Sequence, residues 1–391
     1  MQITTLMLDG SAASVAATGA IRLVADLGGA PTMVVVFAST KQPLAEVLNG
    51  LRAALPDTTV LGCSTAGELT EKGDAKGHTA LFAVRGDLKV HAGYSAGLKA
   101  DAEAAVVRAA APCPATVEGY PHKTAMIFLD ALSGVSEEVT LLAADALGGE
   151  VRLAGGAAGD DLAMKAPLVG LGGDSGADSV VIATLFTKAP LGVGVCHGHR
   201  NLSGPLTITR SVGATVFEVD GRPAWDVWRE QTAAAAKADG IDVDALTDDT
   251  VIGFLLQFEA GLDTGNDVPK IRAPLSRGSD GSLSFACGIP EGSVIRITES
   301  AGDQQISSAR EAALRARAQM GGGEVAGALV FDCICRNLIL KDRFGLAVAG
   351  MTEALGNAPL AGFESYGEVA LDAGDFSGFH NTTTVVLAFP K

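Results

Sequence analysis

Aromatic residues are scarce in this chain of 391 residues, since Phe, Trp and Tyr together make up 5% of it. Basic residues are also few: 29 Lys and Arg stand against 45 Asp and Glu, which gives a formal net charge of −16. Nucleic-acid binding requires a positive surface, so this charge argues against a nucleic-acid partner. An acidic net charge is ordinary for a soluble cytoplasmic protein, and this is the location that we expect.

Long apolar runs, export signals and cysteine pairs are missing as well. No window approaches the ~20 apolar residues that a membrane-spanning helix needs, and the opening MQITTLMLDG lacks the basic and apolar segments of a signal peptide. We therefore expect no membrane partner. The six cysteines are scattered without a CxxC pair, a pattern that favours free thiols and offers no zinc-ligand spacing. The sequence thus predicts neither a metal site nor a cofactor.

One kind of polar turn, by contrast, occurs three times. The turns are GCSTAGE at 62–68, GGAAGDD at 155–161 and GFESYGE at 362–368. Each follows a strand-like run and a helix-like run, so the chain repeats a strand–helix–strand unit that closes on a glycine-framed turn with an acid. Ligands of α/β proteins bind at strand ends. We therefore predict that these turns carry the function.

The alternation of strand-like and helix-like runs through the first half of the chain is typical of an α/β fold. The short RGDL segment joins strand-like runs at 79–84 and 89–95, which predicts a hairpin and therefore a mixed sheet. Further along, runs at 251–260, 282–289 and 293–300 also read as strands. We expect a two-domain α/β sandwich with mixed sheets and repeated strand–helix–strand units.

The segment 205–240 marks the expected domain boundary. It holds both tryptophans and a turn at Asp220, and Pro223 stands at a position that favours the first turn of a helix. We therefore divide the chain into domains at 1–220 and 221–391.

Several motifs, in this order, resemble the FIST-domain family. They are GCSTAGEL (62–69), GGAAGDD (155–161), VGVCHGHR (193–200), EVDGRPAWDVW (218–228), DGSLSFACGIPEGS (280–293), FDCICR (331–336), GFESYGEVA (362–370) and HNTTTVVLAF (380–389). Residues 1–220 are similar to the FIST N-terminal domain and 221–391 to the FIST C-terminal domain. The resemblance implies a bacterial sensory protein that binds a small ligand, with amino acids as proposed ligands and a signalling protein as a possible partner. It assigns no catalytic activity.

The first two turns supply candidate ligand-binding residues. Ser64 and Thr65 bring hydroxyl donors next to backbone N–H groups that could form an anion-binding nest, and Glu68 could accept a ligand ammonium group. The alternative is a packed turn whose hydroxyls cap a helix. Asp160 could bind an amine or a cation, and its alternative is a solvated loop.

The third unit supplies the predicted anchor for an anionic group. Arg336 follows the FDCIC strand, and Arg binds carboxylates in a bidentate way; a surface ion pair is the alternative. Glu364, Tyr366 and Glu368 would add acceptors and an aromatic wall, with His380 and Asn381 hydrogen-bonded back to this turn. A polar cluster at strand ends is unfavourable to bury without a task, so we favour a functional interpretation here.

Two cysteines leave an enzymatic alternative open. Cys63 and Cys333 lie in or beside the predicted site, and either could serve a thiol-dependent hydrolase or transferase if a base lies nearby. A buried inert cysteine is the other interpretation. We favour a binding protein over an enzyme, with no catalytic residue assigned. The predicted function is sensing of a small polar metabolite, such as an amino acid, at the strand-end turns.

Overall fold

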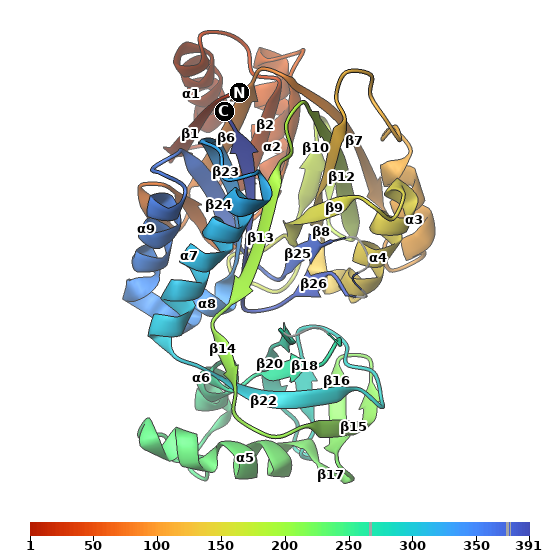
Figure 1. Cartoon of the computed structure of the whole chain (residues 1–391), viewed down its shortest axis with the longest axis vertical. Helices are drawn as coiled ribbons and strands as arrows, with labels where there is room; N and C mark the ends of the chain where they lie inside the picture. Colours follow the sequence, from red (N-terminus) through yellow and green to blue (C-terminus); the bar gives the residue numbers. More distant parts are fainter. Residues whose placement is uncertain (266–267, 373–374, 376) are drawn as a thin grey trace.

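The computed structural model describes residues 1–265, 268–372, 375 and 377–391, and confirms the α/β class with mixed sheets and repeated strand–helix–strand units. A large body holds three six-stranded sheets, and a smaller β-rich domain lies beneath it (Figure 1). No helix among the described residues is both long and apolar enough to cross a bilayer.

The three sheets of the body have equivalent arrangements of six strands: two strands on one side, a central pair, and a hairpin on the other side. The first contains, in spatial order, β1 (Gln2–Leu8), β6 (Thr79–Arg85), β2 (Met33–Ala38), β3 (Thr59–Ser64), β10 (Val169–Leu171) and β11 (Asp174–Gly176). The second contains β7 (Leu88–Ala96), β12 (Ser179–Thr187), β8 (His122–Leu129), β9 (Arg152–Ala157), β25 (Glu368–Leu371) and β26 (Phe379–His380). The third contains β13 (Gly192–His197), β27 (Thr383–Pro390), β23 (Val325–Cys333), β24 (Leu360–Ser365), β4 (Glu68–Thr70) and β5 (Gly73–Ala75).

Each sheet is mixed, because its third and fourth strands are parallel while the others pair antiparallel. The hairpin expected between β6 and β7 is wrong: β6 pairs with β1 and β2, whereas β7 pairs with β12 in the second sheet. The short RGDL turn instead carries the chain from one sheet to the next.

A hairpin from another part of the chain completes each sheet. The hairpin β10–β11, which follows β9, pairs with β3, while β4–β5 pairs with β24 and β25–β26 pairs with β9. The second and third sheets therefore cross the expected division between 1–220 and 221–391.

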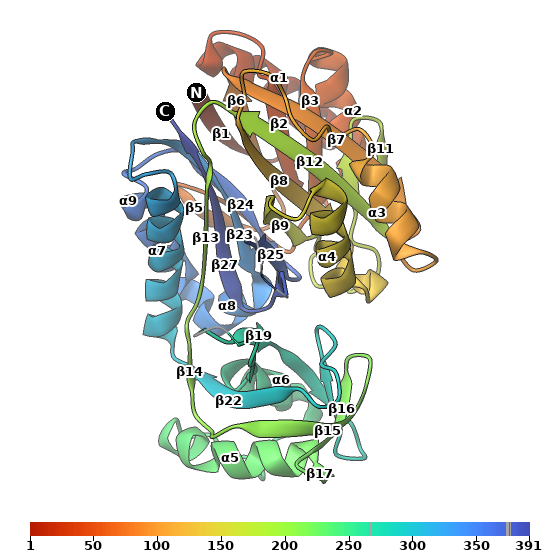
Figure 2. The same cartoon turned by 45° about the vertical axis from the view of Figure 1, so that its right-hand side comes forward.

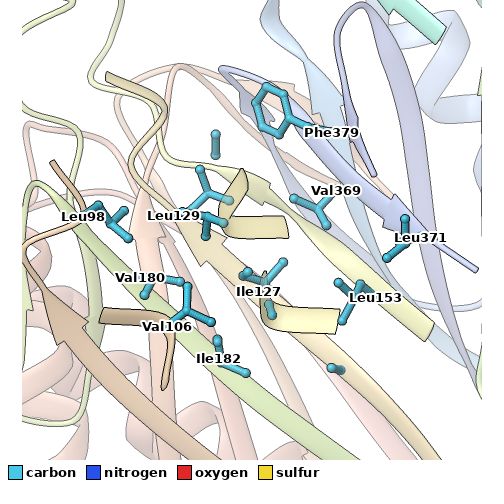
Figure 3. Packing of buried hydrophobic residues seen from close by; sticks show 14 of the residues in the cluster. Leu98, Val106, Ile127, Leu129, Leu153, Val180, Ile182, Val369, Leu371 and Phe379 are labelled. Carbon is cyan, nitrogen blue, oxygen red and sulfur yellow. The ribbon is translucent and has the colours of Figure 1, made fainter. Parts of the chain in front are cut away.

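Two helices cover the outer face of each sheet. They are α1 (Ala12–Leu27) and α2 (Leu44–Ala54) on the first, α3 (Ala102–Ala110) and α4 (Ser136–Leu147) on the second, and α7 (Gly302–Gln319) and α9 (Phe344–Ala354) on the third, with α8 (Ile334–Leu340) ahead of α9. In the second sheet, Ile127 of β8 and Ile182 of β12 gather with Val106 of α3 in this outer layer (Figure 3). The chain thus buries both faces of its central strands, which explains their nearly continuous apolar sequences.

The inner faces of the three sheets meet in one core around equivalent phenylalanines. Phe37, Phe128 and Phe331 occupy matching positions in the central strands, with ring centroids 6.0, 6.5 and 6.1 Å apart. Phe363 stacks on Phe37 at 5.0 Å. The few aromatic side chains of the body are thus concentrated where three sheets must fill one space.

The glycine that opens each repeated turn has a packing role. A Cβ at Gly62, Gly155 or Gly362 would lie 1.9, 1.9 or 2.0 Å from a carbonyl oxygen of the neighbouring strand. No side chain fits there, so the shared glycine is explained by close strand pairing rather than by ligand binding.

The smaller domain interrupts the third unit between β13 and α7. Its elements are β14 (His199–Asn201), β15 (Leu206–Val212), β16 (Thr215–Val219), β17 (Arg222–Pro223), α5 (Ala224–Ala238), α6 (Asp248–Gln257), β18 (Ala260–Leu262), β19 (Lys270–Arg272), β20 (Pro274–Arg277), β21 (Leu283–Phe285) and β22 (Val294–Ser300). Figures 1 and 2 show the chain entering it from β13 and leaving it from β22 to α7. It has a separate core, in which Trp228 donates its Nε1–H to the carbonyl of Phe258 at 2.8 Å.

One expected strand of this domain is a helix. Residues 251–257 belong to α6, which begins with reciprocal bonds between Thr247 and Thr250. Val251, Phe254 and Leu255 are buried at helical spacing. Their apolar run resembles a strand because helix and strand cannot be separated by hydrophobicity alone over so short a segment.

Candidate functional site

Glu68 ties its turn to the strand that follows. One carboxylate oxygen accepts from the Thr65 hydroxyl, and the other accepts from the backbone N–H of His78 at 3.0 Å, just before β6 begins. Burial raises the pKa of Glu68 to about 7. Both oxygens therefore already have partners inside the protein.

Glu368 repeats this arrangement at the equivalent turn. It accepts from the Ser365 hydroxyl at 2.5 Å and from the backbone N–H of Thr383, the first residue of β27, at 3.2 Å. Burial raises the pKa of Glu368 well above its usual value. The shared acid of the two turns thus braces the fold, and these contacts give no support to the predicted roles of Glu68 as acceptor of a ligand ammonium group and of Glu368 as a ligand acceptor.

Asp160 and Tyr366 connect the second and third turns. The Tyr366 hydroxyl donates to Asp160 at 2.6 Å, and the same carboxylate accepts the backbone N–H groups of Met164, Lys165 and Ala166 at 2.7–2.9 Å. Burial raises the pKa of Asp160, but these hydrogen bonds outweigh it and lower the pKa overall. Asp160 therefore orders its own loop.

Ser64 is also bound within the protein. Its hydroxyl donates to the carbonyl of Gly159 at 2.6 Å and accepts the N–H of Leu168 at 2.7 Å. These contacts hold the first turn against the second.

Glu364 is the predicted site acid that has one carboxylate oxygen without a hydrogen-bond partner among the described residues. Asn337 donates to its Oε1 at 2.7 Å, and its Oε2 is buried without a partner in the described part of the chain. Burial raises the pKa of Glu364 to about 8. The carboxyl lies against Gly67, where a Cβ would stand 2.5 Å from its Cδ.

Arg336 is an internal brace. It is fully buried, and its Nε donates to Asp332 at 2.6 Å while its two Nη atoms reach the hydroxyl of Ser308 and both side-chain and backbone oxygens of Gln305. Four of the five guanidinium donors are thereby occupied. The predicted binding of a ligand carboxylate would require these bonds to break.

The two candidate cysteines lack the features of a nucleophile. Cys63 and Cys333 are 0% and 2% exposed, and burial raises the pKa of both thiols well above the usual value. A reactive cysteine needs a lowered pKa and access to substrate. The geometry therefore argues against the thiol-dependent enzyme.

His380 and Asn381 lie where the body meets the smaller domain. His380 pairs with Glu368 across β25 and β26, as expected of a residue near that turn, and its Nε2 lies 3.0 Å from the carbonyl of Ala370. Asn381 faces the other part of the molecule, since its Oδ1 accepts from the N–H of Ala273 at 3.4 Å.

Strand β19 of the smaller domain contacts the body next to His380 and Asn381. Arg272 donates to the carbonyl of Phe379 and to the carboxylate of Glu137 in α4, both at 2.9 Å. Lys270 donates to the carbonyl of Ser377. These two cations stand at alternate positions in a three-residue strand, a pattern that sequence reasoning overlooked because no motif surrounds it.

A cleft of about 980 Å³ opens between α4 and the smaller domain. Arg272 lines it, is 1% exposed, and has an Nε–H without an acceptor among the described residues. The Thr264 hydroxyl, also lining the cleft, has no partner there either. Acidic side chains from both walls share the cleft: Glu137, Glu138, Asp145, Asp263 and Glu291. This cleft has unpaired buried donors beside acids, whereas the unpaired atom of the repeated turns, among the described residues, is the carboxylate oxygen Oε2 of Glu364.

Comparisons with known proteins identify the chain's family. The FIST N domain matches residues 32–222 and the FIST C domain matches residues 224–371. A search of curated proteins found no match. A solved structure of cyanuric acid hydrolase from A. caulinodans is similar over 100% of this chain and 99% of that chain, with 10% sequence identity and a TM-score of 0.33. The two family matches, which together span most of the sequence, confirm the resemblance seen in its motifs, and the chain belongs to the FIST family of sensory domains found in signalling proteins.

Proposed function

We propose that the protein senses a small zwitterionic metabolite, an amino acid or a close relative, in the cleft between α4 and the smaller domain. The observation that carries this proposal is the Nε–H of Arg272, a residue that lines the cleft; this group is buried and has no acceptor among the described residues. An unpaired buried donor is unfavourable by about 1–3 kcal/mol. A ligand carboxylate or carbonyl oxygen would satisfy it, together with the Thr264 hydroxyl.

The charges of the cleft favour a zwitterion over a simple ion. Five acids line the cleft with Arg272, so a purely anionic ligand would be repelled. A purely cationic ligand would leave the Arg272 Nε–H without an acceptor. A zwitterion meets both requirements. Its carboxylate can accept from Arg272, and its ammonium group can lie near acids such as Glu138 or Asp263.

Sensing would follow from the position of the cleft between two parts of the molecule. A ligand that contacts α4 and β19 together favours the arrangement that brings them close, and this difference in affinity is all that a switch requires. The chain joins the two parts at two neighbouring connections: a Cβ at Gly198, between β13 and β14, would lie 2.6 Å from the backbone nitrogen of Gln305 in α7. Motion about this point would change the surface that a signalling partner meets.

The test is a thermal-shift screen of the full chain against amino acids and related metabolites, followed by calorimetry. A ligand at 100 times its Kd should stabilise the protein by about 2.7 kcal/mol. Arg272→Lys keeps the charge but removes the Nε–H, and should weaken binding about tenfold or more. Arg277→Lys, in β20, the next strand along the chain, is the matched control.

Two results would contradict the proposal. One is a screen in which no zwitterion stabilises the wild-type chain. The other is a ligand whose affinity is unchanged by Arg272→Lys but abolished by Glu364→Gln, which would return the site to the strand-end turns.

A further inference from the structure

A second cleft, of about 500 Å³, has walls from β13, α7 and β25 of the body and from the start of β19. Figure 2 shows β13 and α7 standing above β19. Val193, Val195 and Leu371 give it apolar walls, Lys270, His380 and Arg315 contribute nitrogen groups, and the carboxylates of Asp372 and Asp375 also line it. It is separate from the proposed amino-acid cleft, with which it shares none of these residues.

Lys270 is the unusual group of this second cleft. Its side chain is buried, with 6% of the residue exposed, and yet it lines the cleft. Its Nζ lies 3.4 Å from the Nε2 of His380. Burial lowers the pKa of Lys270; Asp375 and Glu137 oppose this shift, while Arg272 adds to it. Burial, together with the neighbouring Lys270, also lowers the pKa of His380, which keeps the imidazole neutral.

We propose that Lys270 captures a small 2-oxo acid as an imine in this cleft. The amine and the neutral imidazole lie together at a cleft wall, where a carbonyl carbon can approach Nζ. Arg315 lines the same cleft. Its Nε pairs with Glu311 at 2.9 Å and one Nη donates to the carbonyl of Val195 at 3.0 Å. Its remaining N–H groups supply donors for the carboxylate, a pairing for which guanidinium is well suited. The apolar walls accommodate a short aliphatic substituent.

The chemistry needs no further reagent. The Nζ lone pair attacks the carbonyl carbon, and a proton moves from nitrogen to oxygen to give a carbinolamine. Loss of water then forms the C=N bond, so that one amine and one carbonyl yield one imine and one water. The Nε2–H of His380 donates to the carbonyl of Ala370 at 3.0 Å, so the imidazole lies beside Nζ at 3.4 Å and the proton passes through a water molecule in the cleft. Amines of this kind act as nucleophiles once burial has made the uncharged form available.

The experiment uses the full chain, pyruvate as the probe and cyanoborohydride to trap the imine. Intact mass and peptide mapping should show one adduct per chain, at Lys270, with the exposed Lys237 modified about tenfold less. Lys270→Arg should abolish the adduct and Lys237→Arg should leave it unchanged. The wild-type peptide map decides the matter even if Lys270→Arg fails to fold. Adducts spread over exposed lysines, or none at Lys270, would overturn the proposal.

A second probe tests the ligand class. Propanal carries the carbonyl but no carboxylate, so Arg315→Ala should reduce labelling by pyruvate about tenfold and leave labelling by propanal unchanged. Capture of propanal at Lys270 without capture of pyruvate would reject the 2-oxo acid. Because Arg272 and Thr264 take no part, failure here leaves the amino-acid cleft untouched, and the reverse also holds.

Discussion

The repeated turns and the junction between body and smaller domain both bury polar groups, but they satisfy them differently. At the turns, Glu68 and Glu368 each use both oxygens to hold the chain at the entrance of the next strand. At the junction, Arg272 and Thr264 line a cleft and have donors without partners in the part of the chain that the structure describes. A sequence motif therefore marked the place where the fold is braced, while the two clefts that we propose as ligand sites carry no motif. Four predictions test this comparison.

Dividing the chain at residue 220 should have the largest effect. Three strand pairings, β3 with β10, β24 with β4 and β9 with β25, hold the sheets together, and the last two join segments on opposite sides of the division. We expect neither 1–220 nor 221–391 to unfold cooperatively alone, as measured by circular dichroism on heating. Mixing the two during refolding should restore a transition. A sharp melt of 1–220 alone would show that the exchanged hairpins are dispensable.

Arg336→Ala should destabilise the protein by about 3–5 kcal/mol, because it leaves Asp332 buried without its ion partner. Chemical denaturation measures the loss. The control is Arg222→Ala, which removes an exposed partner of Glu230 and should change the unfolding free energy by less than about 1 kcal/mol. Equal, small effects of the two substitutions would mean that Arg336 is free for a ligand after all.

Glu364→Gln should change how stability depends on pH. Burial raises the pKa of Glu364 from 4.5 to about 8, so between these values the native state keeps a proton that the unfolded state releases. The stability that this retained proton gives is therefore complete below pH 4.5. It is lost as the pH rises to 8, and the free energy of unfolding falls by about 1.4 kcal/mol per pH unit. The amide removes this slope.

The clearest window for this measurement is pH 7–8, above the pKa of about 7 of Glu68. Urea unfolding of the wild type, Glu364→Gln and the exposed control Glu46→Gln should show a flatter profile for Glu364→Gln alone. Identical slopes in all three proteins would mean that Glu364 is already ionised at neutral pH.

Tyr366→Phe should have the smallest effect, about 1–2 kcal/mol. It removes one of four donors to Asp160 and an acceptor for the N–H of Leu162, while the ring keeps its place. Ligand affinity should not change, in contrast with Arg272→Lys, and calorimetry would compare the two. A loss of affinity in Tyr366→Phe would bring the turns back as a binding site.

Periodic patterns in the sequence predicted the fold class well. The repeated strand–helix–strand runs and the FIST motifs depend on local spacing, which one sequence displays directly. The sequence could not predict that β6 pairs with β1 and β2, or that β7 pairs with β12. The turn between β6 and β7 is short enough for a hairpin, and only pairing with distant strands decides against one. The helix at 251–257 was missed because its apolar residues suit either element.

The site was harder to predict, since hydrogen-bond partners come from distant segments. Arg336 follows a strand end, as ligand-binding residues often do, but its partner Gln305 arrives from α7. Arg272 and Lys270 each line a cleft, and most of the other residues that line these clefts are far away in the sequence. The sequence alone therefore did not single out these two residues. The alternation of cations in the segment 270–272 was the one local signal available.

The pairing of the hairpin β25–β26 with β9 also affects how the chain folds while it is being synthesised. Strand β9 ends at Ala157, but its neighbour β25 begins at Glu368, so the edge of the second sheet has no partner until about 210 more residues have been made. At 5–20 residues per second, that interval lasts roughly 10–40 s. Throughout it the nascent chain presents an unpaired strand edge to its surroundings, and such edges promote aggregation. The hairpin β25–β26, made near the end of synthesis, is the one that completes the second sheet.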